Sequence, residues 1–296
     1  GINVVDVLGL PADRPIATGR DFATLLEPDN ASSRDEAVFN GTGSDDGNGV
    51  PYVVEYSLLP DGKTRSRRLW IEDIGRWYAG PEGRPVRAHG VLRIVNARHE
   101  REQRLDFLSR YDELTGYFNR QHLLTVLGEA VADAIRVRRS MAFMIVSIDK
   151  FRAINEAYGF NIADRVLAVV ARRIKAHLRN DDSIGRFSGA KLGLVLNSCD
   201  ESDMLVAAER FHAAVRNQLV DTEAGAVAVT ASIGGVTLPR HGRNTSSAIA
   251  RAQEALDTAR ARGYGHFVAY AHSAEALAQR QRNAARSREL VEALDK

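Results

Sequence analysis

Short apolar runs alternate with amphipathic stretches in the second half of the chain, and this alternation constrains the fold more than any other feature. Residues 142–148 form a continuous apolar run, which predicts a strand buried in the middle of a sheet. Val166, Val170 and Ile174 recur at the spacing of an amphipathic helix. Residues 192–196 form a second apolar run of strand length. The pattern predicts a domain in which helices accompany a buried sheet.

Length and charge exclude several classes of protein. A chain of 296 residues is long enough for two domains with separate cores. Forty Lys and Arg against 38 Asp and Glu leave a net charge of +2, which argues against a nucleic-acid partner. Cys199 is the only cysteine, so no internal disulfide forms and a reducing cytoplasm fits. No apolar run reaches membrane-spanning length, and no signal peptide begins the chain. The abrupt start suggests an excised fragment, so an upstream membrane anchor stays open.

The first third predicts three consecutive antiparallel strands. Residues 50–59, 66–74 and 86–95 have strand character, and they are separated by turn signals at Pro60-Asp61-Gly62-Lys63 and Pro81-Glu82-Gly83. This order, leading directly into a charged segment, resembles the C-terminal half of a PAS domain. The resemblance implies a sensor or dimerisation domain over residues 1–98.

The charged segment at residues 99–111 predicts a short connecting helix. Leu105, Leu108 and Tyr111 recur at three-residue steps on an otherwise polar stretch. One interpretation is a helix that packs on its own domain. The other is a parallel coiled coil between two protomers, which the PAS resemblance favours.

Several ordered motifs follow. They comprise Asp112-Glu113-Leu114-Thr115-Gly116 with Asn119-Arg120, Ile148-Asp149 with Phe151, Tyr158-Gly159, the alternating residues 227–233 that end in Gly234-Gly235, and the helix at residues 252–265. In this order they resemble a GGDEF domain, the module that condenses two GTP into cyclic di-GMP. The resemblance covers residues 112–271 and implies an α/β (α+β) chain, in which a central sheet flanked by helices follows the PAS-like antiparallel sheet.

The catalytic turn of that family is altered here. The family has Arg-x-Gly-Gly-Asp/Glu-Glu-Phe where residues 186–192 read Arg-Phe-Ser-Gly-Ala-Lys-Leu. The resemblance places metal-binding carboxylates at Ser147 and Ala190 and a catalytic acid at Lys191. Divalent cations need anionic oxygens, which leaves Asp149 as the one candidate ligand and makes bound Mg²⁺ unexpected. We therefore predict a domain without catalytic residues and without cyclase activity.

The positions that recognise the nucleotide in this family match the family residues better than the catalytic positions do. The resemblance assigns the guanine edge to Asn155 and Asp164, and phosphate contact to Arg260. The alternatives are a loop contact for Asn155 and a helix N-cap for Asp164. Lys191 could direct its ammonium at the triphosphate and replace the metal, or it could point into water.

Five further positions bear on a second ligand and on the state of the first site. Phe160 and Ala163 are bulkier than the family residues and could close the guanine slot, and Tyr264 replaces a phosphate-binding Arg. Arg179 and Asp182 match the family's inhibitory cyclic di-GMP site. The alternative is an ordinary helix terminus at that point.

Residues 273–294 predict a polar helix, within a C-terminal segment (residues 272–296) that in this family often leads to an EAL phosphodiesterase domain. The leading hypothesis is a cytoplasmic cyclic di-GMP signalling protein. Its inactive GGDEF domain would bind GTP or cyclic di-GMP, form a homodimer through the PAS-like domain and connecting helix, and control an attached EAL domain. The alternatives are an active diguanylate cyclase and a nucleotide-free dimerisation scaffold.

Overall fold

The computed structural model describes residues 7–10, 16, 19–27, 36, 44–61 and 67–271. Two compact units divide the chain, residues 1–106 and residues 107–296, and each is treated by itself. The predicted C-terminal helix at residues 273–294 and the Gly62-Lys63 half of one predicted turn lie outside the described residues. Among the helices of the described ranges, none is both long and apolar enough to cross a membrane.

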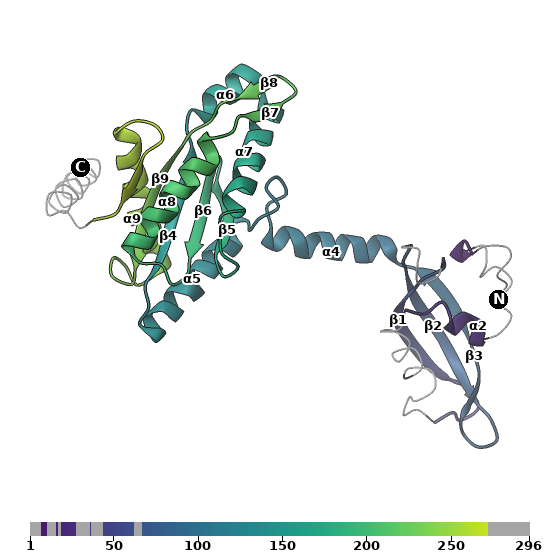
Figure 1. Cartoon of the computed structure of the whole chain (residues 1–296). Helices are drawn as coiled ribbons and strands as arrows, with labels where there is room; N and C mark the ends of the chain where they lie inside the picture. Colours follow the sequence, from purple (N-terminus) through teal and green to yellow (C-terminus); the bar gives the residue numbers. More distant parts are fainter. Residues whose placement is uncertain are drawn as a thin grey trace, which may run out of the picture. The chain divides into compact units, whose positions relative to one another are not determined.

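The first unit contains a three-stranded antiparallel sheet (Figure 1). Its strands are β1 (Val50–Leu58), β2 (Leu69–Ala79) and β3 (Pro85–Ile94), in that order, beside the short helix α2 (Gly19–Ala23). One face packs against Leu8 and Leu25 through the buried side chains of Tyr56 and Ile71. The three predicted strands are present, although β2 continues five residues beyond the predicted end at Ile74. Gly75 and Arg76 interrupt the strand pattern of the sequence there, but the backbone pairs with both neighbouring strands.

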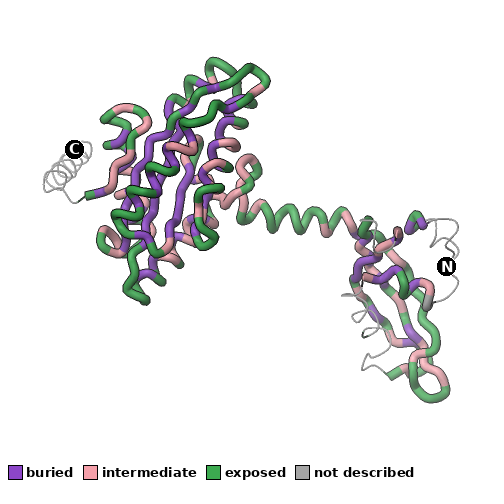
Figure 2. Tube along the Cα trace, in the orientation of Figure 1, coloured by how far each residue is buried: buried purple, intermediate pink, exposed green. Residues whose placement is uncertain are grey.

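Helix α4 (Asn96–Arg110) follows β3 and confirms a helix at the predicted connector. It begins at Asn96, whose side chain accepts a hydrogen bond from the backbone N–H of Trp70. None of its residues is buried, and it is drawn almost entirely as exposed in Figure 2. Its first turn contacts the sheet of the first unit, where the His99 ring stacks on Trp70 with the ring centroids 4.0 Å apart, and the rest of the helix gives no support to packing on its own domain.

A five-stranded mixed sheet forms the centre of the second unit. Its order is β10-β9-β4-β6-β5, with β10 parallel to β9 and the other neighbours antiparallel. A separate hairpin is formed by β7 and β8. The strands are β4 (Met141–Ile148), β5 (Ser183–Ser188), β6 (Lys191–Leu196), β7 (Val220–Thr222), β8 (Gly225–Val227), β9 (Ala231–Leu238) and β10 (Phe267–Ala269).

Helices cover both faces of this sheet, which confirms the predicted α/β class (Figure 1). They are α5 (Arg120–Val137), α6 (Phe151–Tyr158), α7 (Phe160–Lys175), α8 (Glu201–Arg216) and α9 (Thr245–Ala261). Alternation along β4 sets the two cores: Met144 and Val146 pack with α7 and α8, whereas Phe143 and Ile145 pack with α5 and α9. Ser147 continues the second series and therefore faces the side of α9.

The start of α7 corrects one interpretation. The helix begins at Phe160, after Gly159, whose φ of 83° ends α6. Asp164 therefore lies inside the helix and is not its N-cap. The apolar stripe beginning at Val166 correctly predicted the buried face of the helix, but it did not indicate where the helix begins.

Candidate functional site

The site is built at one end of the sheet, where β4 ends and β5 turns into β6. Antiparallel register places Ser147 of β4 directly opposite Lys191 of β6. The turn between β5 and β6 is held by Arg186, whose guanidinium donates to the Gly189 carbonyl at 3.1 Å and to the Asp112 carboxylate at 3.1 Å. Asp112 thus has a structural role at the hairpin.

Helix α9 brings a second cation and an amide to these two residues. Arg260 donates a hydrogen bond to the Ser147 hydroxyl. The Lys191 ammonium donates to Oε1 of Gln253 at 3.0 Å, so Lys191 does not simply point into water. Burial, and secondarily the nearby charge of Arg260, lower the pKa of Lys191 below its ordinary value. A cation therefore replaces the catalytic acid that the family resemblance places at position 191, and the guanidinium of Arg260 contacts Ser147, where the resemblance places a metal-binding acid.

Asp149 is buried, and its carboxylate already accepts hydrogen bonds from neighbouring residues. It accepts hydrogen bonds from the Thr230 hydroxyl at 2.7 Å, the Ser232 hydroxyl at 2.6 Å and the Gly265 backbone N–H at 2.9 Å. These contacts join the end of β4 to β9 and to the loop before β10. Within the described ranges, no group of three or more His, Cys, Asp or Glu side chains could hold a metal ion. The residues present do not fit the family's pair of divalent metals, because the donor set has lost its anionic oxygens.

A cavity of about 530 Å³ opens above these residues. Its wall carries four basic side chains, Lys150, Arg152, Lys191 and Arg260, and includes no carboxylate. We call it the cationic cavity. Residues 150–152 belong to the N-terminal end of α6, where free backbone N–H groups and the helix dipole also favour anions.

Asn155 and Asp164, the predicted guanine-reading pair, lie on the adjacent helices α6 and α7. The Oδ1 atom of Asn155 is buried and has no hydrogen-bond partner among the described residues. The side chain of Phe160 is 76% exposed, and Ala163 is fully buried in the sheet core. The ring of Phe160 is therefore mostly in solvent, and its exposure gives no support to closure of the slot by this side chain.

Arg179 and Asp182, the predicted inhibitory pair, do not present a shared polar surface. The buried Asp182 carboxylate accepts hydrogen bonds from the backbone N–H groups of Arg179 and Asn197, at 3.0 and 3.1 Å. Burial raises the pKa of Asp182, against the effect of these two donors. The Arg179 side chain is exposed. This arrangement matches the alternative interpretation, in which Asp182 stabilises the turn after the helix.

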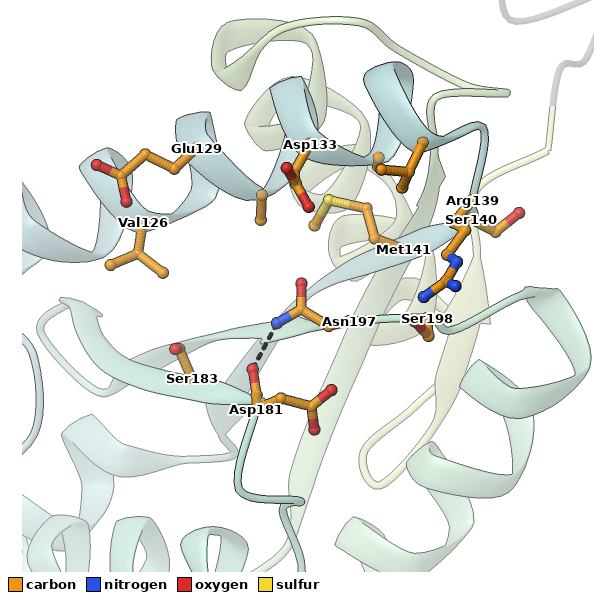
Figure 3. A pocket seen from close by; sticks show the side chains of 13 residues that line it. Val126, Glu129, Asp133, Arg139, Ser140, Met141, Asp181, Ser183, Asn197 and Ser198 are labelled. Atoms are coloured by element: carbon orange, nitrogen blue, oxygen red, sulfur yellow. Dashed lines mark hydrogen bonds between the residues drawn. The ribbon is translucent and has the colours of Figure 1, made fainter.

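A cavity of about 450 Å³ adjoins this turn (Figure 3). Glu129 and Asp133 of α5 lie across it from Asp181 and Asn197, and Arg139 is the one basic side chain in its wall. Three carboxylates against one guanidinium make this cavity a poor place for the phosphates of a nucleotide.

The structure thus brings together Ser147, Lys191 and Arg260 in one cavity, with Asn155 on the helix that begins there. It leaves Arg179 and Asp182 apart from them. Sequence reasoning missed Lys150, Arg152 and Gln253. Lys150 follows Asp149 and Arg152 lies two residues further on. Both could have been predicted to lie at the start of the helix that follows the buried strand. Nothing in the sequence marks Gln253.

The family comparison agrees with this fold. The profile described as "Diguanylate cyclase, GGDEF domain" matches residues 109–266. The chain belongs to the GGDEF-domain family.

Two curated relatives illustrate the family. The bifunctional diguanylate cyclase/cyclic di-GMP phosphodiesterase MucR of Pseudomonas aeruginosa is 32% identical over 191 residues, which is 64% of this chain and 27% of MucR. Diguanylate cyclase DosC of Escherichia coli K12 is 31% identical over 153 residues, 51% of this chain and 33% of DosC. The chain therefore spans about a quarter to a third of the length of these relatives.

Solved structures show the same fold. Diguanylate cyclase SiaD of P. aeruginosa, in complex with its activator SiaC, superposes with a TM-score of 0.53 at 31% identity, covering 59% of this chain and 69% of SiaD. The isolated GGDEF domain of PA1120 from P. aeruginosa gives a TM-score of 0.53 at 26% identity, covering 55% of this chain and 95% of that domain.

Proposed function

We propose that this chain is a regulatory module of cyclic di-GMP signalling whose GGDEF domain binds GTP without making cyclic di-GMP. The cationic cavity carries this proposal. Its four basic side chains and lack of carboxylates suit a bare triphosphate and repel the divalent metals on which phosphoryl transfer depends. Charge-assisted hydrogen bonds from Lys191 and Arg260 would replace the metal ions in neutralising the phosphates.

Guanine recognition in this proposal belongs to Asn155 and Asp164. An acceptor carboxylate can take the guanine N1–H and N2–H groups, and an amide can donate to O6. The buried amide oxygen of Asn155 has no partner in the described chain. With that oxygen buried, the NH₂ end of the amide is the group that would donate to a bound base.

Calorimetry of the full chain with GTP in excess EDTA tests the proposal. We expect binding without metal, no gain on adding Mg²⁺, and no cyclic di-GMP after prolonged incubation. An Asp164→Ala variant should weaken GTP binding and leave inorganic triphosphate unaffected, because only the base contact is removed. Product formation would instead establish an active cyclase, and absence of any nucleotide binding would leave a dimerisation scaffold.

Cyclic di-GMP at Arg179 and Asp182 is less favoured by the geometry, because the Asp182 carboxylate already accepts two backbone donors. An Arg179→Ala variant distinguishes binding of cyclic di-GMP at this turn from binding of GTP in the cationic cavity. If cyclic di-GMP binds the wild type and this variant loses it while keeping GTP, the second site exists. If cyclic di-GMP binding is absent or unchanged, it does not.

In this proposal the other parts of the protein sense a signal and transmit it. The three-stranded N-terminal sheet would act as a PAS-like sensor and, with α4, join two protomers. The nucleotide state of the GGDEF domain would pass to an EAL phosphodiesterase domain beyond residue 296. The similarity to MucR, whose name records both cyclase and phosphodiesterase activities, supports that arrangement.

A further inference from the structure

Lys191 differs from the other described lysines of the chain in its surroundings. The sequence holds five lysines, of which Lys150, Lys175 and Lys191 belong to the described residues. Lys150 is exposed, and Lys175 ends α7 without lining the cationic cavity. Lys191 is half-buried and lines that cavity beside the guanidinium of Arg260. An amine in this place is a candidate nucleophile, because burial and a neighbouring cation both disfavour its protonated form.

The contacts of Lys191 fix its amine at the cavity wall. Its Nζ atom donates to Oε1 of Gln253 at 3.0 Å, and its backbone is paired with Ser147 of β4. Burial first, and then the charge of Arg260, lower the pKa of Lys191, while Asp257 acts in the opposite direction. The unprotonated, nucleophilic form of the amine is therefore more abundant at neutral pH than in an ordinary lysine.

The other basic side chains of the cavity suit a reagent that carries phosphate. Lys150, Arg152 and Arg260 share the wall with Lys191, and no carboxylate lies in it. The volume of about 530 Å³ has room for a small phosphorylated molecule. Basic side chains bind phosphate through charge-assisted hydrogen bonds. A molecule held by its phosphate would therefore keep its other end close to the Lys191 amine, and such proximity accelerates a bond-forming step.

From this arrangement we infer that Lys191 is a modification site for small acyl phosphates, the mixed anhydrides of a carboxylic acid and phosphate. The lone pair of Nζ attacks the acyl carbon, and the bond from that carbon to the phosphate oxygen breaks. Inorganic phosphate leaves with the bonding pair, and Nζ gives up one proton to water as the amide forms. Arg260 and the cations of α6 stabilise the charge that develops on the leaving phosphate.

Acylation of Lys191 gives the nucleotide site a means of regulation. The amide carries no charge, so the cavity loses one of its four cations and one charged hydrogen-bond donor. GTP should then bind more weakly, and bound GTP should shield Lys191 from the reagent. This consequence rests on the proposed GTP binding, whereas the acylation itself depends only on the cavity and the amine.

Peptide mass spectrometry of the full chain, after incubation with acetyl phosphate, tests the modification. We expect Lys191 to be acetylated several-fold faster than Lys150 and Lys175, and inorganic triphosphate to slow the reaction at Lys191. The N-hydroxysuccinimide ester of acetic acid transfers the same acyl group without a phosphate, so most of the preference for Lys191 should disappear with it.

A pair of arginine variants tests the part played by the cavity. Arg260→Gln should slow acetylation of Lys191 by acetyl phosphate about tenfold, because a charged donor to the phosphate is lost. Arg262→Gln removes an exposed arginine that does not line the cavity and is the matched control. Equal rates at the three described lysines, or equal rates in the two variants, would overturn the inference.

Calorimetry of the acetylated protein with GTP in EDTA measures the consequence. Affinity should fall about 10- to 100-fold, the range for one hydrogen bond to a charged group. Lys191→Gln treated with acetyl phosphate should show no further loss, and an equal loss in this variant would assign the effect to other lysines and overturn the regulation. Selective acetylation of a protein that never binds GTP would refute the proposed function and leave the modification site standing. GTP binding with an unreactive Lys191 would refute this inference alone.

Discussion

Lys191 places a half-buried ammonium at the turn where the family resemblance calls for an acid. Its pKa is lowered by burial and by Arg260, so it releases its proton at a lower pH than an ordinary lysine. Below the lowered pKa it is charged and can hold phosphate. As the pH rises through that pKa, the charge and the attraction are lost.

The first prediction concerns this titration. GTP affinity in EDTA should fall as pH rises through the lowered pKa of Lys191, and Lys191→Met should remove that step. The variant should also bind GTP about 10- to 100-fold more weakly at neutral pH, since a hydrogen bond to a charged group contributes about 1.5–3 kcal/mol. Calorimetry over a pH series measures both. Parallel pH profiles for the two proteins would show that Lys191 does not contact the phosphates.

Asp182 carries a second prediction at this scale. Asp182→Ala leaves two backbone N–H groups without their acceptor and should lower the free energy of unfolding of the second unit by about 2 kcal/mol. Asp181→Ala is the matched control, because the exposed Asp181 contributes its backbone carbonyl and not its carboxylate to Asn197. Urea unfolding followed by helical circular dichroism suits the measurement, since the long helices α5, α7, α8 and α9 lie in this unit. Equal losses in both variants would contradict the structural role.

Among the elements, β9 and α9 fix the geometry of the cationic cavity by close contact. A Cβ atom built on Gly234 would lie 2.1 Å from the backbone nitrogen of Leu256 and 2.4 Å from the carbonyl of Ala252. Only glycine allows the helix to approach the strand this closely. The same helix carries Gln253 and Arg260 to the site.

The third prediction follows from this approach. Gly234→Ala should push α9 off the sheet, destabilise the second unit by several kcal/mol and weaken GTP binding together with it. Gly128→Ala, where the added carbon meets only the Thr245 hydroxyl at 3.3 Å within a helix, should change stability by about 1 kcal/mol or less. Thermal unfolding and calorimetry compare the two variants. Unchanged stability in Gly234→Ala would contradict the packing argument.

Elements also show what the sequence could and could not predict. The apolar runs of β4 and β6 were predictable because strands buried on both faces need apolar residues throughout. The start of α7 was not, because Phe160 and Asn161 at its beginning are exposed and Asp164, just before the stripe that starts at Val166, has the character of an N-cap. At the site, the resemblance located Ser147, Lys191 and Arg260, but the bond between Arg260 and Ser147 depends on the side of the sheet that α9 covers. The side of a sheet that a helix covers is decided by tertiary packing, which the sequence pattern alone does not reveal.

For the whole molecule, the question is what stabilises helix α4, which has no buried residue. A 15-residue helix with no buried residue is marginal in water, because the cost of nucleation is offset by few bonds. Leu105 is 60% exposed on it. Pairing of α4 with the same helix of a second copy would cover this side chain, which agrees with the proposed homodimer.

The fourth prediction tests this pairing with one charge. Leu105→Glu should shift the full chain from dimer to monomer in sedimentation velocity and lower its helical content, because a buried carboxylate on each protomer would repel the other. Gln103→Glu places the same charge on the opposite side of α4 and should leave the dimer intact. GTP affinity should stay unchanged in both variants, since no residue of α4 lines the cationic cavity. A wild-type protein that is monomeric at micromolar concentration would contradict the proposed pairing, and α4 would then need a partner other than its own copy.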